Sequence, residues 1–202
     1  MLTKSEERVM ALGKMVKHIP NLMTMANLIL GMWLISLIIH AGNFHRAALF
    51  ILLGGLIDFF DGLVARKLNA VSHMGKQLDS FADIITFGVA PIVLINHIHA
   101  GQPSSSLIWL TSMVFIGAGA YRLARFNISD FTDHFLGLPI PVAGIALAIY
   151  ATLHPILSRA ISWHGDTPLY SKITSLFLIL LSVLMVSRKK IRRFKTNSRN
   201  TH

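Results

Sequence analysis

Long apolar stretches recur along the chain at intervals that suit membrane-spanning helices. Each is about 20 residues long, the length that carries a helix across the hydrocarbon core of a bilayer. Short polar or proline-containing segments separate them. The expected spans are residues 22–40, 45–65, 77–97, 105–125, 139–157 and 169–187. The pattern therefore predicts an all-α, polytopic membrane protein with six transmembrane helices.

A different pattern precedes the first span. Val9, Leu12, Val16 and Ile19 recur at helical spacing, while the basic residues of this segment lie mostly on other faces. We interpret the segment as an amphipathic helix lying in the membrane interface, with a solvated helix or a frayed end as the alternative. The expected organisation is an amphipathic interfacial helix at 1–20, a six-span domain at 21–187 and a basic tail at 188–202.

The distribution of charge sets the expected orientation. The 202-residue chain is 53% hydrophobic and 14% charged, with a net charge of +10. A positive charge of this size can indicate a nucleic-acid partner, but the basic residues follow the positive-inside pattern of a membrane protein. With both termini in the cytoplasm, all of the 19 basic residues except Arg46, Arg159 and Lys172 lie on the cytoplasmic side. No nucleic-acid partner is therefore expected. The chain has no cysteine, which excludes disulfides, thiolate metal sites and cysteine nucleophiles.

Four aspartates interrupt the apolar pattern where a membrane protein least tolerates charge. Asp58 and Asp61 lie near the inner end of the second span, and Asp79 and Asp83 near the inner start of the third. The spacings i,i+3 and i,i+4 place each pair on one helix face. Two neighbouring antiparallel helices then bring both pairs to one level. Carboxylates gathered in this way repel one another and need a compensating cation.

The residue types around the aspartates indicate which ligands the site would take. Oxygen donors without cysteine or histidine suit Mg²⁺ or Mn²⁺ rather than zinc. Gly62 and Gly75 leave the helix backbone open to a flat ligand, and the guanidinium of Arg66 suits phosphate oxygens. This combination predicts a diphosphate site. The alternative is a set of polar residues that only holds helices together, which accounts for one or two aspartates but not for a cluster beside an arginine.

These residues form a motif of fixed spacing. The segment Asp58-x2-Asp61-Gly62-x2-Ala65-Arg66-x8-Gly75-x3-Asp79-x3-Asp83 resembles the full signature of the CDP-alcohol phosphotransferase family. The stretch 19–27 resembles the segment before that family's first span. The stretches 83–91, 122–127 and 137–141 are similar to its phosphatidylserine synthase branch. The last span and the tail match the family only in being apolar and basic, not residue by residue.

The resemblance implies a six-helix fold, usually a homodimer, in the cytoplasmic membrane of a prokaryote, with the active site facing the cytoplasm. It implies that Asp58, Asp61 and Asp79 hold Mg²⁺ or Mn²⁺, with two ions expected. Asp83 would join the metal site and act as general base. The implied contacts to the CDP moiety are Gly62, Ala65, Arg66 and Gly75.

The implied reaction transfers the phosphatidyl group of CDP-diacylglycerol to the hydroxyl of L-serine and releases CMP. Two metal ions would stabilise the attacking and leaving oxygens. Arg122 and Arg125, at the inner end of the fourth span, could clamp the serine carboxylate, and Asn127 could add a hydrogen bond. From charge patterns alone the two arginines serve equally well as membrane anchors or as partners of acidic residues in the next loop. The resemblance favours the acceptor role.

Some assignments remain open on the sequence. Asn21, Thr24 and Asn27 share a helix face and are candidate nucleotide contacts, with capping of the first span as the alternative. Within the family, a phosphatidylglycerophosphate synthase would need further cationic groups for its phosphate-ester acceptor. A divalent-cation transporter could use the aspartates as a permeation site, but Arg66 would repel a passing cation. A structural scaffold would leave the carboxylates without a purpose.

Overall fold

The computed structural model describes residues 19–41, 44–68, 72–101, 105–128, 135–162, 167–188 and 190–191. The predicted interfacial helix at 1–20 and the basic tail at 188–202 lie almost wholly outside these residues. The elements are α2 (Ile19–Ala41), α3 (Phe44–Lys67), α4 (His73–Asp83), the π-helix η1 (Ile84–Val89), α5 (Ala90–Ile98), α6 (Ser105–Ile128), β1 (Phe135–Leu136), α7 (Ile140–Ser162), α8 (Thr167–Val186) and β2 (Lys190–Ile191).

The prediction of an all-α membrane protein is confirmed. Within the described residues, 5 helical segments are long and apolar enough to cross a membrane. These are Ile19–His40, His45–Lys67, His73–Ile98, Ser105–Ile128 and Leu169–Val186. A sixth, shorter apolar helix covers Ile140–His154 and coincides with the predicted fifth span. Large apolar side chains on the outer surface, including Leu49, Trp109 and Leu176, are exposed, as expected of a surface that faces lipid.

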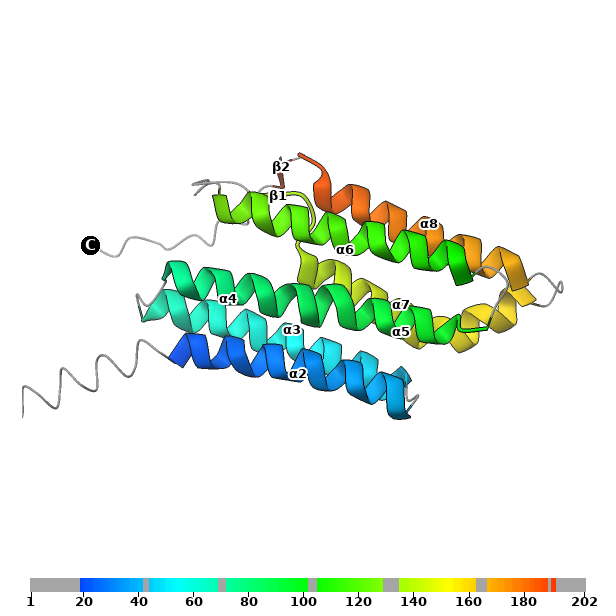
Figure 1. Cartoon of the computed structure of the whole chain (residues 1–202), viewed down its shortest axis with the longest axis horizontal. Coiled ribbons are helices and arrows are strands. Elements are labelled where there is room, and N and C mark those ends of the chain that lie inside the picture. The colour runs from blue at the N-terminus through cyan, green and yellow to red at the C-terminus, as the bar shows by residue number, and fades with distance from the viewer. Residues whose placement is uncertain are drawn as a thin grey trace, which may run out of the picture.

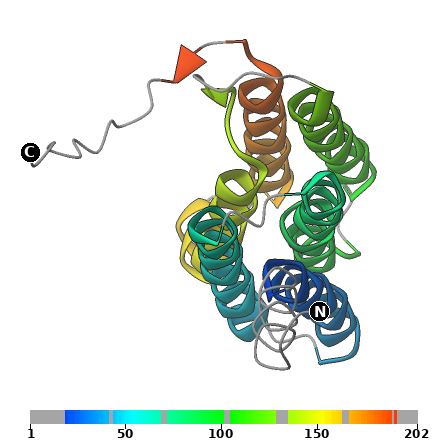
Figure 2. The same ribbon diagram turned by 90° about the vertical axis from the view of Figure 1, so that its left-hand side faces the viewer.

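The helices run side by side along the long axis of the molecule (Figure 1). α2 packs against both α3 and α4, the two helices that carry the aspartates. α7 covers α3, η1 and α5, while α6 packs mainly against α8. The view along the helices shows α6 and α8 as a pair on one side of the bundle (Figure 2). We call the end where α2, α4 and α7 begin, and where α3, α6 and α8 end, the site end.

A π-helical segment interrupts the third span directly after Asp83. Its wide turn is packed closely by α2 and α3. Thr86 donates a hydrogen bond to the carbonyl of Asn27 at 3.1 Å. A Cβ at Gly31 would meet the Thr86 hydroxyl, and one at Gly54 would lie 2.9 Å from the Thr86 methyl. The two helices can therefore approach η1 only because both positions lack a side chain.

The strands β1 and β2 pair at the site end, next to α8. Phe135 pairs with Ile191, and Leu136 with Lys190, in antiparallel register. Gly137 follows with φ 74°, in the left-handed region that favours glycine. A Cβ at this position would collide with carbonyls of the last turn of α8, including that of Ser187 at 2.9 Å just beyond it. The loop therefore packs tightly on the end of α8, and Leu138 N–H donates to Leu184 O at 3.0 Å.

Candidate active site

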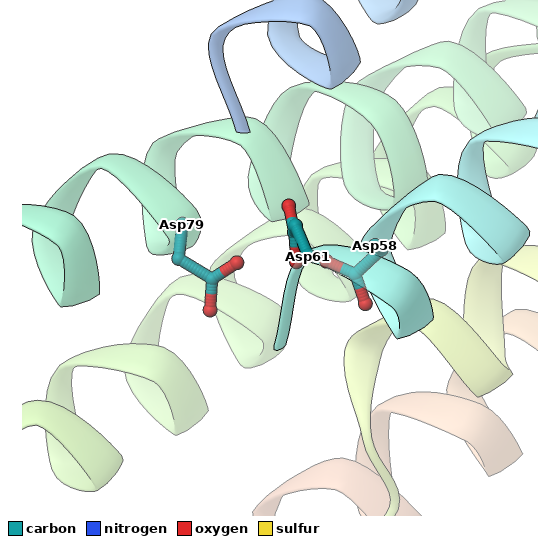
Figure 3. A group of neighbouring side chains, drawn as sticks. All are labelled: Asp58, Asp61 and Asp79. Atoms are coloured by element: carbon teal, nitrogen blue, oxygen red, sulfur yellow. The ribbon is translucent and has the colours of Figure 1, made fainter. Parts of the chain in front are cut away.

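The carboxylates of Asp58, Asp61 and Asp79 converge at the site end, as the sequence predicts. One oxygen from each lies within 4.8 Å of the other two. Asp58 and Asp61 come from α3, and Asp79 comes from α4 (Figure 3). Their side chains turn toward the same space. Because α3 and α4 both pack on α2, this space lies between two helices that a third helix holds in place.

Asp83 is the fourth aspartate of the motif, and its side chain is buried. It is the last residue of α4, directly before the π-helix, and its side chain is only 7% exposed. Its carboxyl group contacts that of Asp58 on α3. Its Oδ1 has no hydrogen-bond partner among the described residues. A buried carboxylate oxygen without a partner is costly unless a ligand satisfies it, so this oxygen is available to a metal ion or a proton donor.

The first span contributes a residue that holds the cluster in place. The Thr24 hydroxyl lies 3.2 Å from Asp61 Oδ2 and 3.0 Å from the carbonyl of Pro20, and it donates toward both acceptors. Thr24 and Asp61 are both buried. A hydrogen bond of this kind fixes the direction in which the carboxylate lone pairs point. Thr24 therefore orients an aspartate, a role that the sequence did not reveal. Its predicted contact to the nucleotide stays a prediction.

The residues of the cluster fit a hard divalent cation. The donors are all carboxylate oxygens, which Mg²⁺ and Mn²⁺ prefer. Three donor atoms within 4.8 Å of one another can share one ion or lie around a pair. The three carboxylates gather negative charge at one place, which a bound cation would neutralise.

The glycines and arginine of the motif lie beside the cluster. A Cβ at Gly62 would have one neighbour, the Arg66 guanidinium at 3.8 Å, so this face of α3 is open and carries a positive charge. Arg66 is exposed, and Ala65 is half-buried one turn beyond Asp61. An open backbone next to a guanidinium is what a diphosphate requires. Of the positions predicted to line the CDP moiety, Gly62, Ala65 and Arg66 lie on α3 and are half-buried or exposed.

Gly75 on α4 has a packing role, and its predicted contact to the CDP moiety stays a prediction. Its N–H donates to the Ser72 hydroxyl at 2.9 Å, which caps the start of α4. A Cβ here would lie 2.8 Å from Asn21 Oδ1 and 3.1 Å from Ser72 Oγ. Glycine therefore lets α2 and α4 approach at the site end. Asn21 lies at this contact and is half-buried; its predicted contact to the nucleotide stays a prediction.

Arg122 brings a positive charge close to Asp83. It lies on α6, is 6% exposed, and interacts electrostatically with Asp83. Its Nε has no hydrogen-bond partner among the described residues. A buried guanidinium with a free N–H, next to a buried carboxylate, has donors left for an anionic group of a ligand. The predicted role of Arg122 toward the acceptor stays a prediction.

The other two predicted acceptor residues have different surroundings. Arg125 Nη1 donates to the carbonyl of Val186 at 3.1 Å, at the end of α8, and its guanidinium lies 5.8 Å from the Tyr121 ring centroid. This contact ties α6 to α8, in keeping with the anchoring alternative. The Asn127 amide donates to Ser80 Oγ at 2.9 Å, while its buried Oδ1 has no partner among the described residues. Their roles toward the acceptor stay predictions.

Comparisons with known proteins identify relatives of the chain by sequence. The model of the CDP-alcohol phosphatidyltransferase family matches residues 17–187. A CDP-diacylglycerol–serine O-phosphatidyltransferase of Bacillus subtilis is 42% identical over 186 residues, which cover 91% of this chain and 94% of the relative. A protein of the same name from Helicobacter pylori is 36% identical over 181 residues, 87% of this chain and 72% of the relative. An archaetidylserine synthase of Methanothermobacter thermautotrophicus is 34% identical over 173 residues, 84% and 67% of the two chains.

Proposed function

Because the chain belongs to the CDP-alcohol phosphatidyltransferase family, we propose that it transfers the phosphatidyl group of CDP-diacylglycerol to the hydroxyl of L-serine. The observation that carries the proposal is the convergence of three carboxylates on one space, with Asp83 and the buried Arg122 next to it. The relatives named for serine transfer support the choice of acceptor. The products are a phosphatidylserine and CMP.

The carboxylates are the proposed ligands of the divalent cations. Asp58, Asp61 and Asp79 would hold Mg²⁺ or Mn²⁺, in two positions, with Asp83 adjoining them. The bound cations would neutralise the diphosphate and stabilise charge on the attacking and leaving oxygens. Thr24 keeps Asp61 turned toward that position.

The nucleotide half of the donor would lie along α3. Gly62 gives the diphosphate access to the helix backbone, and the Arg66 guanidinium beside it supplies hydrogen-bond donors. Ala65 and Gly75 complete the proposed CDP site, with Asn21 at its edge. The acyl chains would remain in the lipid that surrounds the exposed apolar side chains of the bundle.

Asp83 is the proposed general base. It would take the proton of the serine hydroxyl as the hydroxyl oxygen forms a bond to the phosphorus that carries diacylglycerol. The bond from this phosphorus to the bridging oxygen of the diphosphate breaks, and its electron pair leaves with CMP. The deep position of Asp83, away from bulk water, would favour the serine hydroxyl over water as the nucleophile.

Arg122 is the proposed partner of the serine carboxylate. When the free N–H of Arg122 binds the serine carboxylate, the position of Arg122 next to Asp83 would place the serine hydroxyl near that base. Asn127, through its unpartnered Oδ1, could accept from the serine ammonium. Arg125 would contribute from the next turn of α6, in addition to its bond with α8.

The membrane, the orientation in it and the assembly of the protein are also proposals. The protein is integral to a membrane, and we place it in the cytoplasmic membrane of a prokaryote with the site end facing the cytoplasm. The positive-inside distribution of basic residues supports this orientation. A homodimer is the proposed assembly, with the domain at 21–187 as its folded unit. The interfacial helix at 1–20 and the basic tail at 188–202 would both lie on the cytoplasmic side.

An acceptor panel tests the proposed function. Purified protein is incubated with CDP-diacylglycerol, a divalent cation and one alcohol at a time, and CMP release is measured. We expect release with L-serine, and much less with glycerol 3-phosphate or inositol. Preference for glycerol 3-phosphate would reassign the chain to phosphatidylglycerophosphate synthesis. Divalent-cation uptake into liposomes without CMP release would instead support a transporter.

A further inference from the structure

Lys76 bridges the two sides of the active site at the site end. It lies in the first turns of α4, and its ammonium donates to the carbonyls of Phe126 at 3.0 Å and Asn127 at 3.4 Å. The same ammonium lies 4.7 Å from the centroid of the Phe126 ring. Carbonyls in the last turn of a helix lack partners within the helix, and a cation there also interacts favourably with the helix dipole. Lys76 therefore caps the end of α6 from a different helix.

A second set of hydrogen bonds runs parallel to this contact. The Asn127 amide donates to Ser80 Oγ at 2.9 Å and to Gln77 Oε1 at 3.3 Å. Ser80 Oγ in turn donates to the Lys76 carbonyl at 3.1 Å, which fixes the orientation of the serine. The last turn of α6 is thus bonded to two successive turns of α4.

The helices joined in this way carry the two halves of the proposed site. α4 carries Asp79 and Asp83, and α6 carries Arg122 a little more than one turn before Asn127. Elsewhere α6 packs mainly against α8, with fewer contacts to η1, α5 and α4. The hydrogen bonds from α4 therefore act directly on the position of the end of α6 relative to the carboxylates.

We propose that Lys76, together with Ser80 and Asn127, forms a latch that sets the spacing between Asp83 and Arg122. Lys76 and Ser80 do not touch the substrates; they are positioning residues for the acceptor alcohol, and they hold Asn127 through its backbone carbonyl and its side-chain amide nitrogen. The latch would affect the serine KM only if the proposed function is right, because Arg122 must then bind the acceptor. Its effect on the distance between α4 and α6 does not depend on the proposed function.

Spin labels test the structural part without any assay of activity. The chain has no cysteine, so labels can be attached through Met74→Cys on α4 and Ile128→Cys on α6. Both side chains are exposed, at 67% and 84%. The label-to-label distance is measured by dipolar EPR in the otherwise native protein and with Lys76→Met added. We expect a longer or broader distance distribution in the Lys76→Met protein and recovery of the native distribution with Lys76→Arg. An unchanged distribution in Lys76→Met would overturn the latch.

Kinetics test the positioning part. Lys76→Met should raise the serine KM about tenfold, the scale of one charge-assisted hydrogen bond, and leave the KM for CDP-diacylglycerol nearly unchanged. Lys76→Arg should restore most of the loss, because it keeps a cation over the α6 carbonyls. Lys172→Met, a matched change of an exposed lysine on α8, should leave both constants unchanged.

The two experiments separate the possible failures. A wild-type protein that releases no CMP with serine would contradict the proposed function, while the EPR result would still decide the latch. A Lys76→Met protein with the native distance, or with equal changes in both KM values, would show that Lys76 stabilises the fold without positioning the acceptor side.

Discussion

The Thr24 hydroxyl donates to Asp61 Oδ2 at 3.2 Å, which joins the first span to the carboxylate cluster on the second. The two residues are 37 positions apart in the chain, and both are buried. Since Asp61 is a proposed metal ligand, the hydroxyl acts on the metal site through the orientation of that carboxylate. Loss of such a partner weakens metal binding without removing a ligand.

Thr24→Val should therefore lower the affinity for Mn²⁺ by about 10- to 100-fold, the usual scale for the loss of a partner that orients a ligand. Valine keeps the shape of threonine, so packing changes little. Free Mn²⁺ is measured by EPR in a titration of the purified protein. Thr111→Val is the matched control, because the hydroxyl of this buried threonine donates to Leu107 and Ile108 of its own helix. Equal affinities in the two variants would contradict an orienting role for Thr24.

Asp83→Asn keeps the shape of the side chain and removes the proton acceptor. We expect turnover to fall by about 10² or more, the scale of a lost general base. The KM for CDP-diacylglycerol should change far less, because Asp83 lies on the side of the cluster that faces Arg122. Steady-state kinetics with saturating divalent cation measures both constants. Near-normal turnover in this variant would exclude Asp83 as the base.

The two arginines on α6 should behave differently. Arg122→Ala should raise the serine KM by roughly 10- to 150-fold, since it removes a charge-assisted bond worth about 1.5–3 kcal/mol. Arg122→Lys should rescue only part of the loss because it lacks the planar fork. Arg125 bonds the end of α8, so Arg125→Ala should lower thermal stability and raise the serine KM less. A serine KM that responds to Arg125→Ala but not to Arg122→Ala would reverse this assignment.

Because α7 packs closely against the π-helix, replacing one glycine of α7 should lower the stability of the protein. A Cβ at Gly144 would lie 2.7 Å from Phe87 Cβ and 2.8 Å from its Cα, in η1. Gly144→Ala should destabilise the protein by about 1–3 kcal/mol, because the backbone of η1 cannot move aside without strain. The change is measured as a shift of Tm in detergent. Gly117→Ala on α6 is the control, since a Cβ there meets nothing within 4 Å. Equal Tm values for the two variants would refute tight packing at η1.

The carboxylate cluster was predictable because it depends on local spacing. Asp58 and Asp61 share a helix face by period alone, and so do Asp79 and Asp83. Short loops between antiparallel spans then leave little freedom in their relative depth. The motif adds the glycines and Arg66 at fixed offsets, and the structure places Gly62 and Arg66 together on α3.

The remaining features depend on how helices rotate against one another, which local patterns do not specify. Thr24 looked like a capping or nucleotide-binding residue, and only the packing of α2 on α3 shows its bond to Asp61. The π-helix at 84–89 has an ordinary apolar sequence, so nothing in its pattern distinguishes it from an α-helix. Arg122 and Arg125 cannot be told apart by charge, but they point in different directions around α6. Arg122 is buried, whereas Arg125 bonds the end of α8.

The central claim is that the serine hydroxyl attacks phosphorus at this site, and an isotope experiment tests it most directly. Purified protein is supplied with CDP-diacylglycerol and L-serine carrying ¹⁸O in the hydroxyl, and the phosphatidylserine and CMP are analysed by mass spectrometry. The account predicts ¹⁸O in the phosphatidylserine, none in the CMP, and loss of labelled product in Asp83→Asn. Phosphatidylserine without the label, labelled CMP, or no phosphatidylserine at all would contradict it.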